Sequence, residues 1–242
     1  MLVINGATGS IGGAIVEVAT KEFKEVIGIG RDISRLKKLE SRYGNFKGFQ
    51  ISDVANQKEA ETLCQNIFSS TQKPVAYIHT IGIIDRNENS AAINSQIWEK
   101  VIHINLFGTY IWNQIFLENF KKHKISGSIV NLTSQAYRTG GYGYIPAYAA
   151  SKGGIVSMSK SFARHGGEFG IRVNCVSPGF LENKMMTNGL SESQIAYFEN
   201  KTLLKHLGTD LDAAKACVFL AGSDSQYITG EVLDVSGGNI LG

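Results

Sequence analysis

The stretch Leu2-Val-Ile-Asn5-Gly6-Ala-Thr-Gly-Ser-Ile-Gly12 decides the fold of this chain. Its apolar start predicts a short strand over 2–5, and its glycines predict a tight turn that opens a helix over 11–21. Glycine lets a backbone approach a pyrophosphate closely, and a helix N-terminus offers free N–H groups and a partial positive charge. The stretch therefore predicts a dinucleotide phosphate loop, although an ordinary turn capped by Thr8 or Ser10 is the alternative. The predicted loop residues are Gly6, Thr8, Gly9, Ser10, Ile11 and Gly12.

Short apolar runs alternate with helical patterns along the rest of the 242 residues. We expect strands over 25–30, 46–51, 75–79, 128–132, 172–176 and 232–235. We expect helices over 33–42, 57–69, 97–120, 147–165 and 212–220. Such alternation requires a parallel sheet with helices on both faces, because each crossover is right-handed. The prediction is a single domain over 1–242, a doubly wound α/β (Rossmann) fold of about seven strands.

The composition is that of a soluble globular protein. Hydrophobic residues make up 43% of the chain and charged residues 19%, and a net charge of +3 is too small to indicate a nucleic-acid partner. No apolar run is long enough to span a membrane and no leader segment is recognisable, so we expect a cytoplasmic protein. Cys64, Cys175 and Cys217 lack ligand or redox spacing, which predicts buried reduced thiols and no metal site.

The residues after the second strand bear on the choice between NAD and NADP. Asp32 lies about 20 positions after the glycine loop, where an acidic residue commonly binds a ribose 2′-hydroxyl. However, the strand ends at Gly30, Arg31 follows directly, and Asp32 is better placed as the N-cap of the next helix. The planar guanidinium of Arg31 suits a 2′-phosphate, and Arg35 lies one helical turn further on. We therefore expect NADP, with NAD as the alternative.

A second group of functional candidates lies in the middle of the chain. Strand 128–132 leads to Ser134 at the carboxyl edge of the sheet, where open α/β sheets bind ligands. Tyr148 and Lys152 are at i and i+4 of a predicted helix and therefore face the same way. A phenol titrates near ~10, and a nearby ammonium lowers that pKa. Tyr148 would then act as general acid or base while Ser134 holds the substrate oxygen, although a Tyr–Lys pair alone is more often structural.

Together these residues resemble the short-chain dehydrogenase/reductase family, in its compact single-domain branch, and the resemblance covers nearly the whole chain. It implies interconversion of a carbonyl and a secondary alcohol with a nicotinamide dinucleotide, most simply as a ketoreductase. Asn105 would hold a helix kink and relay protons through a water to Lys152, which would also hold the nicotinamide ribose together with Tyr148. The remaining cofactor contacts implied by the resemblance are Asp53 and Val54 at the adenine and Gly82, Pro178 and Gly179 along the nicotinamide half.

Several positions depart from the family pattern. Asn5 replaces the usual threonine before the first glycine, and His79 replaces the first asparagine of Asn-Asn-Ala-Gly. We expect His79 to be structural and hypothesise that it forms a hydrogen bond with Asn5. Asn183 stands where a threonine is usual. The loop between Ser134 and Tyr148 is one residue longer than usual and rich in glycine and tyrosine.

The substrate is less well defined by the sequence than the chemistry. The sequence as a whole, and the segment Tyr227-Ile-Thr-Gly-Glu231 especially, most resembles the β-ketoacyl-(acyl carrier protein) reductases. Those enzymes dock an acidic carrier through basic residues. The matching residues, Ile125 and Phe169, are uncharged, so Lys121, Lys122 and Lys124 would have to substitute. A thioester and a small free ketone, sugar or specialised-pathway intermediate therefore remain open. Residues 182–206, with Met185, Met186, Tyr197 and Phe198, are expected to form a specificity-setting lid or an oligomer contact.

The resemblance implies a homotetramer or homodimer, while the net charge and the hydropathy pattern indicate no nucleic-acid or membrane partner. Three other functions compete with a ketoreductase. The first is NAD-dependent oxidation of a hydroxyl on a sugar or a specialised-pathway intermediate. The second is a nucleotide-sugar epimerase or dehydratase, suggested by the glycine spacing. The third is a non-catalytic dinucleotide sensor, although such proteins typically lose the tyrosine or the lysine.

Overall fold

A seven-stranded parallel sheet forms the centre of the protein, in the order β3-β2-β1-β4-β5-β6-β7. The computed structural model describes residues 1–84 and 94–241. The chain order reverses at β1, between β2 and β4, and ligand sites of open α/β sheets lie at such switch points. The predicted doubly wound fold is therefore confirmed. The strands are β1 (Leu2–Asn5), β2 (Val26–Gly30), β3 (Phe46–Gln50), β4 (Ala76–His79), β5 (Ser128–Leu132), β6 (Arg172–Pro178) and β7 (Val232–Val235).

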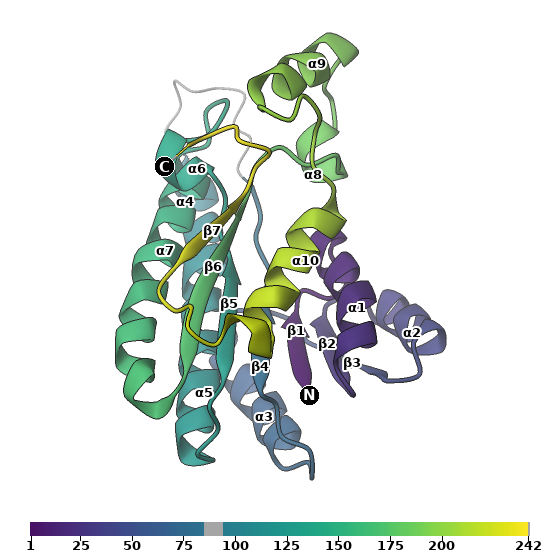
Figure 1. The fold of residues 1–242 in the computed structure, drawn as a ribbon, viewed down its shortest axis with the longest axis vertical. Helices are drawn as coiled ribbons and strands as arrows, with labels where there is room; N and C mark the ends of the chain where they lie inside the picture. The colour runs from purple at the N-terminus through teal and green to yellow at the C-terminus, as the bar shows by residue number, and fades with distance from the viewer. Residues whose placement is uncertain (85–93, 242) are drawn as a thin grey trace.

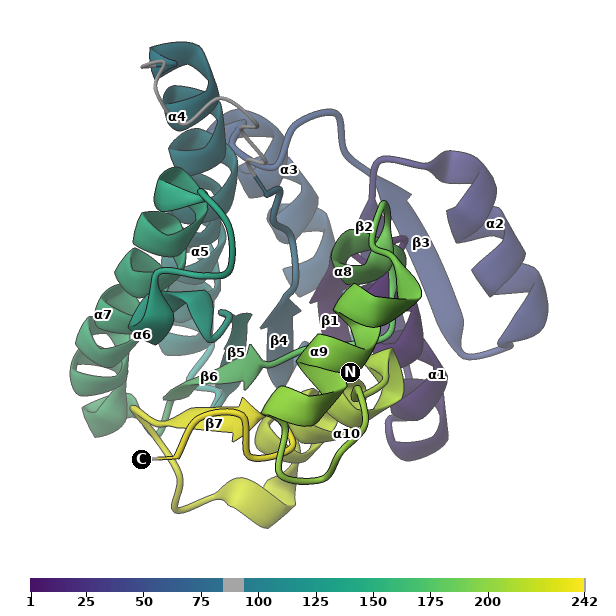
Figure 2. The ribbon, with the colours of Figure 1, turned by 90° about the horizontal axis from the view of Figure 1, so that it is seen from above.

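Helices cover both faces of the sheet (Figures 1 and 2). One face carries α3 (Gln57–Phe68), α5 (Gly108–Lys122) and α7 (Pro146–Gly166), and the other carries α1 (Ser10–Glu22), α2 (Ile33–Arg42) and α10 (Asp210–Ala221). Helix α4 (Ser95–Ile102) leads into α5 through a π-helical turn, His103–Phe107. The short helices α6 (Ala136–Thr139) and α8 (Lys184–Thr187) and the longer α9 (Glu192–Lys201) lie beyond the carboxyl ends of the strands.

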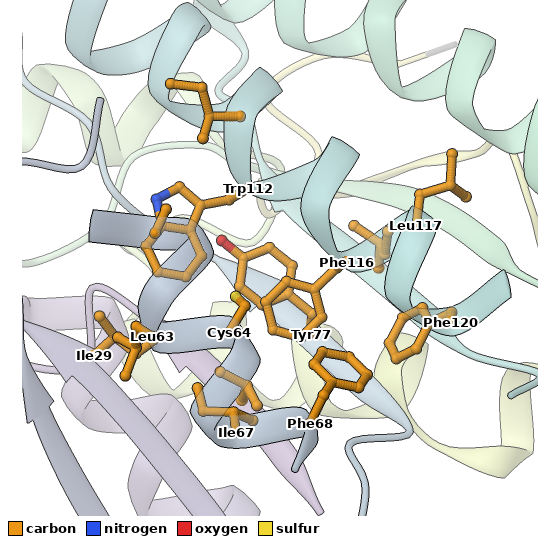
Figure 3. Close-up of a cluster of buried hydrophobic side chains, with 14 of the residues drawn as sticks. Ile29, Leu63, Cys64, Ile67, Phe68, Tyr77, Trp112, Phe116, Leu117 and Phe120 are labelled. Carbon is orange, nitrogen blue, oxygen red and sulfur yellow. The ribbon is translucent and has the colours of Figure 1, made fainter. Parts of the chain in front are cut away.

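The core consists of two apolar layers, one on each face of the sheet. In the layer under α5, the buried ring of Tyr77 stacks on Phe116 at a centroid distance of 4.0 Å and lies beside Trp112 (Figure 3). Each large side chain buried in this way contributes roughly 1.5–3 kcal/mol to stability. The strands are thereby fixed from both sides, and the loops at their carboxyl ends start from a rigid edge.

The element boundaries differ from the sequence-based expectation in three places. The single helix expected over 97–120 is interrupted by the π-helical turn. Residues 182–206 contain α8 and α9, and α9 begins at a capping box between Ser191 and Gln194. A second capping box, Thr209 with Asp212, starts α10 at Asp210 rather than at 212. Hydrophobic periodicity does not report these signals, because capping depends on single polar residues.

Two smaller expectations concern the thiols and the membrane. Cys64, Cys175 and Cys217 are buried and unpaired, as predicted. Burial in apolar surroundings raises the pKa of the Cys175 thiol to about 11, which keeps it protonated at neutral pH. Among the helices that the structure describes, none combines the length and the apolar character needed to cross a bilayer.

Candidate active site

The phosphate loop is shaped by glycines that no other residue can replace. Gly6 has a φ of +94°, which L side chains rarely adopt. A Cβ on Gly12 would lie 2.0 Å from the Gly6 carbonyl oxygen, so a side chain there would force the loop open. Gly9 is the N-cap of α1 and no side chain caps this helix end. The first-turn N–H groups thus have no intrahelical acceptor. A backbone cradle that a Cβ would fill fits a pyrophosphate.

The residues after β2 are arranged as the sequence predicts. Asp32 accepts a hydrogen bond from the Arg35 N–H at 3.1 Å and caps α2. Hydrogen bonds from Ser34 and the Arg35 backbone lower the pKa of this carboxyl group. Arg35 donates to the Thr8 carbonyl at 3.0 Å and so braces the phosphate loop. Arg31 is exposed and lines the same cavity, and its guanidinium makes no hydrogen bond or ion pair with any residue that the structure describes.

Lys152 and Tyr148 lie together on α7, which begins at Pro146. Lys152 is only 3% exposed, and its Nζ lies 5.6 Å from the centroid of the Tyr148 ring. The ammonium donates to the Leu132 carbonyl at 2.9 Å, which holds it at the end of β5. Burial lowers the pKa of Lys152 to about 8. Ser134, two residues beyond β5, lines the same cavity as Tyr148 and Lys152.

Asn105 lies in the π-helical turn and is fully buried. Its Oδ1 accepts from the Ile83 N–H at 2.8 Å, and its Nδ2 donates to the Ile83 carbonyl at 2.8 Å and to Ser151 Oγ at 3.0 Å. The side chain therefore holds the segment after β4 against α7 and does not bond its own helix. Gly82 is enclosed there, since a Cβ on it would lie 3.2 Å from Lys152 Nζ.

Two predicted cofactor residues lie outside the cavity lining. Asp53 accepts a hydrogen bond from the Ala55 N–H at 3.0 Å in the turn after β3. Val54 is buried, and its carbonyl accepts from Trp112 Nε1 at 2.9 Å. Both follow β3 at the carboxyl edge of the sheet, so their predicted adenine contacts stay a prediction. Pro178 and Gly179, by contrast, line the cavity directly.

His79 and Asn5 do not form the hydrogen bond that we hypothesised. They are partners in the register of β1 and β4, but both side chains turn to the hydroxyl of Tyr77. His79 Nδ1 lies 2.7 Å from that oxygen, and Asn5 Nδ2 donates to it at 3.3 Å. Burial, and secondarily the charge of Lys152, lowers the pKa of His79 to about 3. A neutral imidazole in the core fits the structural role expected for His79.

An aromatic cluster closes the substrate side of the site. Tyr142, from the glycine-rich loop, meets Phe180 at 5.0 Å and Phe198 of α9 at 5.6 Å between ring centroids. Phe180 and Phe198 are 4.6 Å apart. The predicted lid therefore contacts the loop that precedes Tyr148. The sequence reasoning missed Phe180, which follows Pro178-Gly179 and could have been found from that position.

A cavity of about 800 Å³ at the carboxyl edge of the sheet joins the phosphate loop, the residues after β2, Ser134, Tyr148, Lys152 and the aromatic cluster. The charged side chains that line it, among the residues described, are Arg31, Asp32, Arg35 and Lys152. Except for Lys152, they lie at the end with the phosphate loop, so the far half is uncharged. That half is lined mainly by apolar and aromatic side chains, among them Tyr142, Ile145, Phe180, Met185, Met186, Leu190 and Phe198, and also by the polar side chains of Thr139 and Asn183.

The basic cluster at the end of α5 lies far from this cavity within the chain. Lys121 Nζ is 2.9 Å from His165 Nε2, near the C-terminal end of α7, and lies over the ring of Phe169. His165 follows Tyr148 by 17 positions on this helix, a distance of about 25 Å along its axis. Figure 1 shows α8 and α9 above one edge of the sheet and the end of α5 at the other. Lys121 lies beside Phe169, one of the two positions matched to the carrier-docking residues, so the substitution of Lys121, Lys122 and Lys124 for those residues stays a prediction.

Comparisons with known proteins agree with this geometry. The family model described as enoyl-(acyl carrier protein) reductase matches residues 6–239. The 3-oxoacyl-(acyl-carrier-protein) reductase of Rickettsia felis is 32% identical over 238 residues, which cover 98% of this chain and 95% of that protein. The human (3R)-3-hydroxyacyl-CoA dehydrogenase is 32% identical over 195 residues, 81% of this chain and 74% of the relative.

A solved structure has the same fold. The crystal structure described as ribose-5-phosphate isomerase from Brucella melitensis 16M has a TM-score of 0.89 and 27% sequence identity, covering 98% of this chain and 91% of that one. The isomerase name belongs to that protein, whereas the family match concerns nearly every residue of this chain. The chain therefore belongs to the short-chain dehydrogenase/reductase family, and it is an oxidoreductase that interconverts a carbonyl and an alcohol with a nicotinamide dinucleotide.

Proposed function

We propose that the protein is an NADPH-dependent ketoreductase whose substrate carbonyl lies between Ser134 and Tyr148. One observation carries this proposal: Ser134, Tyr148 and Lys152 line a single cavity that begins at the phosphate loop. A cofactor held at that loop and a carbonyl held at Ser134 would then share one enclosed volume.

The roles of the side chains follow from their positions. The bound cofactor supplies the hydride. Ser134 donates a hydrogen bond to the carbonyl oxygen, where negative charge develops, and the Tyr148 hydroxyl delivers the proton to the same oxygen. The Lys152 ammonium favours the phenolate that Tyr148 leaves behind. Asn105 acts indirectly, because its hydrogen bonds to Ile83 and Ser151 hold the segment around Gly82 beside Lys152.

The preference for NADPH over NADH is assigned to Arg31. Its exposed guanidinium has no partner among the described residues and lines the phosphate-loop end of the cavity. Asp32, the acidic residue that would otherwise bind a ribose hydroxyl, is engaged as the cap of α2. A planar fork with free donors suits a 2′-phosphate.

The substrate half supports an apolar, uncharged substrate. The relatives are described as acting on 3-oxoacyl groups on a carrier protein and on 3-hydroxyacyl-CoA. A thioester of this kind presents an apolar chain beside its ketone, which suits the lining by aromatic and aliphatic residues.

We further propose a cytoplasmic homotetramer or homodimer. Phe107, Tyr110 and Phe169 are each more than 40% exposed on the face formed by α5 and α7, and such surfaces mark association sites. Buried thiols without disulfides fit a reducing compartment. Sedimentation of the purified chain measures the state directly, and a monomer would contradict this part of the proposal.

A substrate screen tests the function. Consumption of NADPH is followed spectroscopically with 3-oxoacyl thioesters, their small ester analogues, free ketones, quinones and keto-sugars, in parallel with NADH. The proposal predicts turnover of the 3-oxo compounds with NADPH and a loss of about tenfold or more in NADPH affinity on Arg31→Ala, with NADH affinity unchanged. Turnover of the keto-sugars alone, or equal use of NADH by the wild type, would contradict it.

A further inference from the structure

A carboxylate bridges the two halves of the cavity. Ser10 Oγ of the phosphate loop donates to Asp210 Oδ2, and Asn183 Nδ2 donates to Asp210 Oδ1 at 2.7 Å. Ser10 and Asn183 both line the cavity, on its cofactor side and its substrate side respectively. Asp210 is the first residue of α10 and comes from a third segment of the chain.

The chain geometry brings the segments of Asn183 and Asp210 together independently of the bridge. Leu181 and Gly208 form an isolated parallel bridge, and the Glu182 N–H donates to the Gly208 carbonyl at 2.8 Å. Asn183 is further fixed at the base of α8, because its Oδ1 accepts from the Met186 N–H at 3.1 Å. The Nδ2 group must therefore face Asp210, so the direction of the hydrogen bond is determined.

The Asp210 carboxylate satisfies both neighbours. Ser10 and Asn183 each offer a donor, and a carboxylate has two acceptor oxygens. An asparagine at position 210 would keep both contacts, because it could accept from Asn183 and donate to the Ser10 hydroxyl, which is itself an acceptor. An alanine at position 210 offers neither neighbour a partner, so removal of the side chain breaks both contacts.

We propose that Asp210 is a positioning residue that fixes the lid, α8 and α9, relative to the phosphate loop. Through Asn183 it holds the segment that carries Met185 and Met186 into the substrate half of the cavity. Its effect on turnover rests on the proposed function, whereas its effect on the lid does not. This arrangement fixes the side of the cavity that contacts the substrate relative to the loop that binds the cofactor.

The charge of Asp210 distinguishes this role from ordinary stabilisation. A carboxylate beside the phosphate loop disfavours a bound pyrophosphate, so its removal should leave NADPH binding unchanged or tighten it by about two- to threefold. The same change should free the lid and raise the KM of the ketone. Simple structural damage would weaken both.

The test compares full-length variants by hydrogen exchange and kinetics. Asp210→Ala should raise the amide exchange rate of residues 184–201 roughly fivefold and the ketone KM by a similar factor, the effect of one lost hydrogen bond. The matched control is Asp212→Ala, which removes the same side chain from the same helical turn but breaks the pair with Thr209. It should leave exchange of 184–201 and the KM within about twofold of the wild type.

Asn183→Asp places two carboxylates face to face and should free the lid, and adding Asp210→Asn supplies a rescue. In the double variant the amide at 210 donates to the new carboxylate and accepts from Ser10, which restores the bridge with one bond reversed. Wild-type exchange of 184–201 in the double variant supports the proposal. Unchanged exchange in Asp210→Ala, or exchange in the double variant as fast as in Asn183→Asp, would overturn it.

Two further measurements distinguish a failure of this proposal from a variant that does not fold and from a failure of the proposed function. If Asp210→Ala does not fold, Ser10→Ala breaks the bridge from the other side, and unchanged exchange of 184–201 in that variant would also overturn the role of Asp210. If the wild type turns over no ketone, the proposed function fails, while exchange still decides on the bridge.

Discussion

Replacing His79 with asparagine removes the imidazole buried in the core behind the active site. His79 is 1% exposed, and its one hydrogen bond to a described residue is that between Nδ1 and the Tyr77 hydroxyl, at 2.7 Å. Because the site is buried and Lys152 adds a positive charge nearby, the pKa of His79 falls from 6.5 to about 3 in the folded protein. The imidazole therefore stays neutral in the fold at pH values where the unfolded chain is protonated.

The sign and size of the effect follow from proton linkage. Where the unfolded state binds more protons, the free energy of unfolding falls as the pH is lowered. This contribution is complete above the unfolded pKa of about 6.5 and is lost as the pH falls toward the folded pKa of about 3. Between about pH 6.5 and pH 4.5 the loss amounts to roughly 2–3 kcal/mol, a large share of a typical domain's stability.

Urea unfolding of the wild type and of His79→Asn at about pH 7.5, 5.5 and 4.5 measures this difference. Asparagine does not titrate, so the variant should lose roughly 2–3 kcal/mol less than the wild type over the acid range, whatever its stability at neutral pH. Equal acid slopes in His79→Asn and the wild type would refute the buried neutral imidazole.

Three further predictions concern the cavity. Lys152 has a pKa of about 8 in the folded protein and of 10.5 as a free side chain, so the free energy of unfolding should rise by about 3 kcal/mol between about pH 8 and 10.5. Urea unfolding of Lys152→Met should lack this rise. Gly12→Ala places a methyl group 2.0 Å from the Gly6 carbonyl oxygen and should abolish NADPH binding in a fluorescence titration, whereas Gly13→Ala, with no atom nearer than 3.9 Å, should bind normally. Phe198→Ala removes an apolar wall and should raise the KM for long-chain 3-oxo esters about tenfold with little change for the shortest, and a uniform change would contradict an apolar substrate half.

The fold and the centre of the site could be predicted from sequence because their signals are local. The strand–turn–helix unit at Gly6–Gly12 and the i, i+4 spacing of Tyr148 and Lys152 each lie within one segment, and alternation of strand and helix leaves few topologies. Asp32 as a helix cap is likewise a local signal, and the structure confirms it.

The remaining features depend on contacts between distant segments. The contact of Asn5 and His79 with Tyr77 depends on where the rings of the core place a hydroxyl, which periodicity does not encode. Asp210 contacts Ser10, which is 200 positions away in the sequence, and no local pattern around residue 210 predicts a partner in the phosphate loop. The aromatic cluster of Tyr142, Phe180 and Phe198 likewise combines two loops and helix α9.

The assignment of Tyr148 as the proton donor is the central claim, and Tyr148→Phe tests it most directly. The variant keeps the ring and removes only the hydroxyl, so the account predicts that NADPH binds within about threefold of the wild-type Kd while kcat for a 3-oxo substrate falls about a hundredfold to ten-thousandfold. Single-turnover hydride transfer from bound NADPH is the measurement, since it does not depend on product release. A phenylalanine variant that transfers hydride within about tenfold of the wild-type rate would contradict the account.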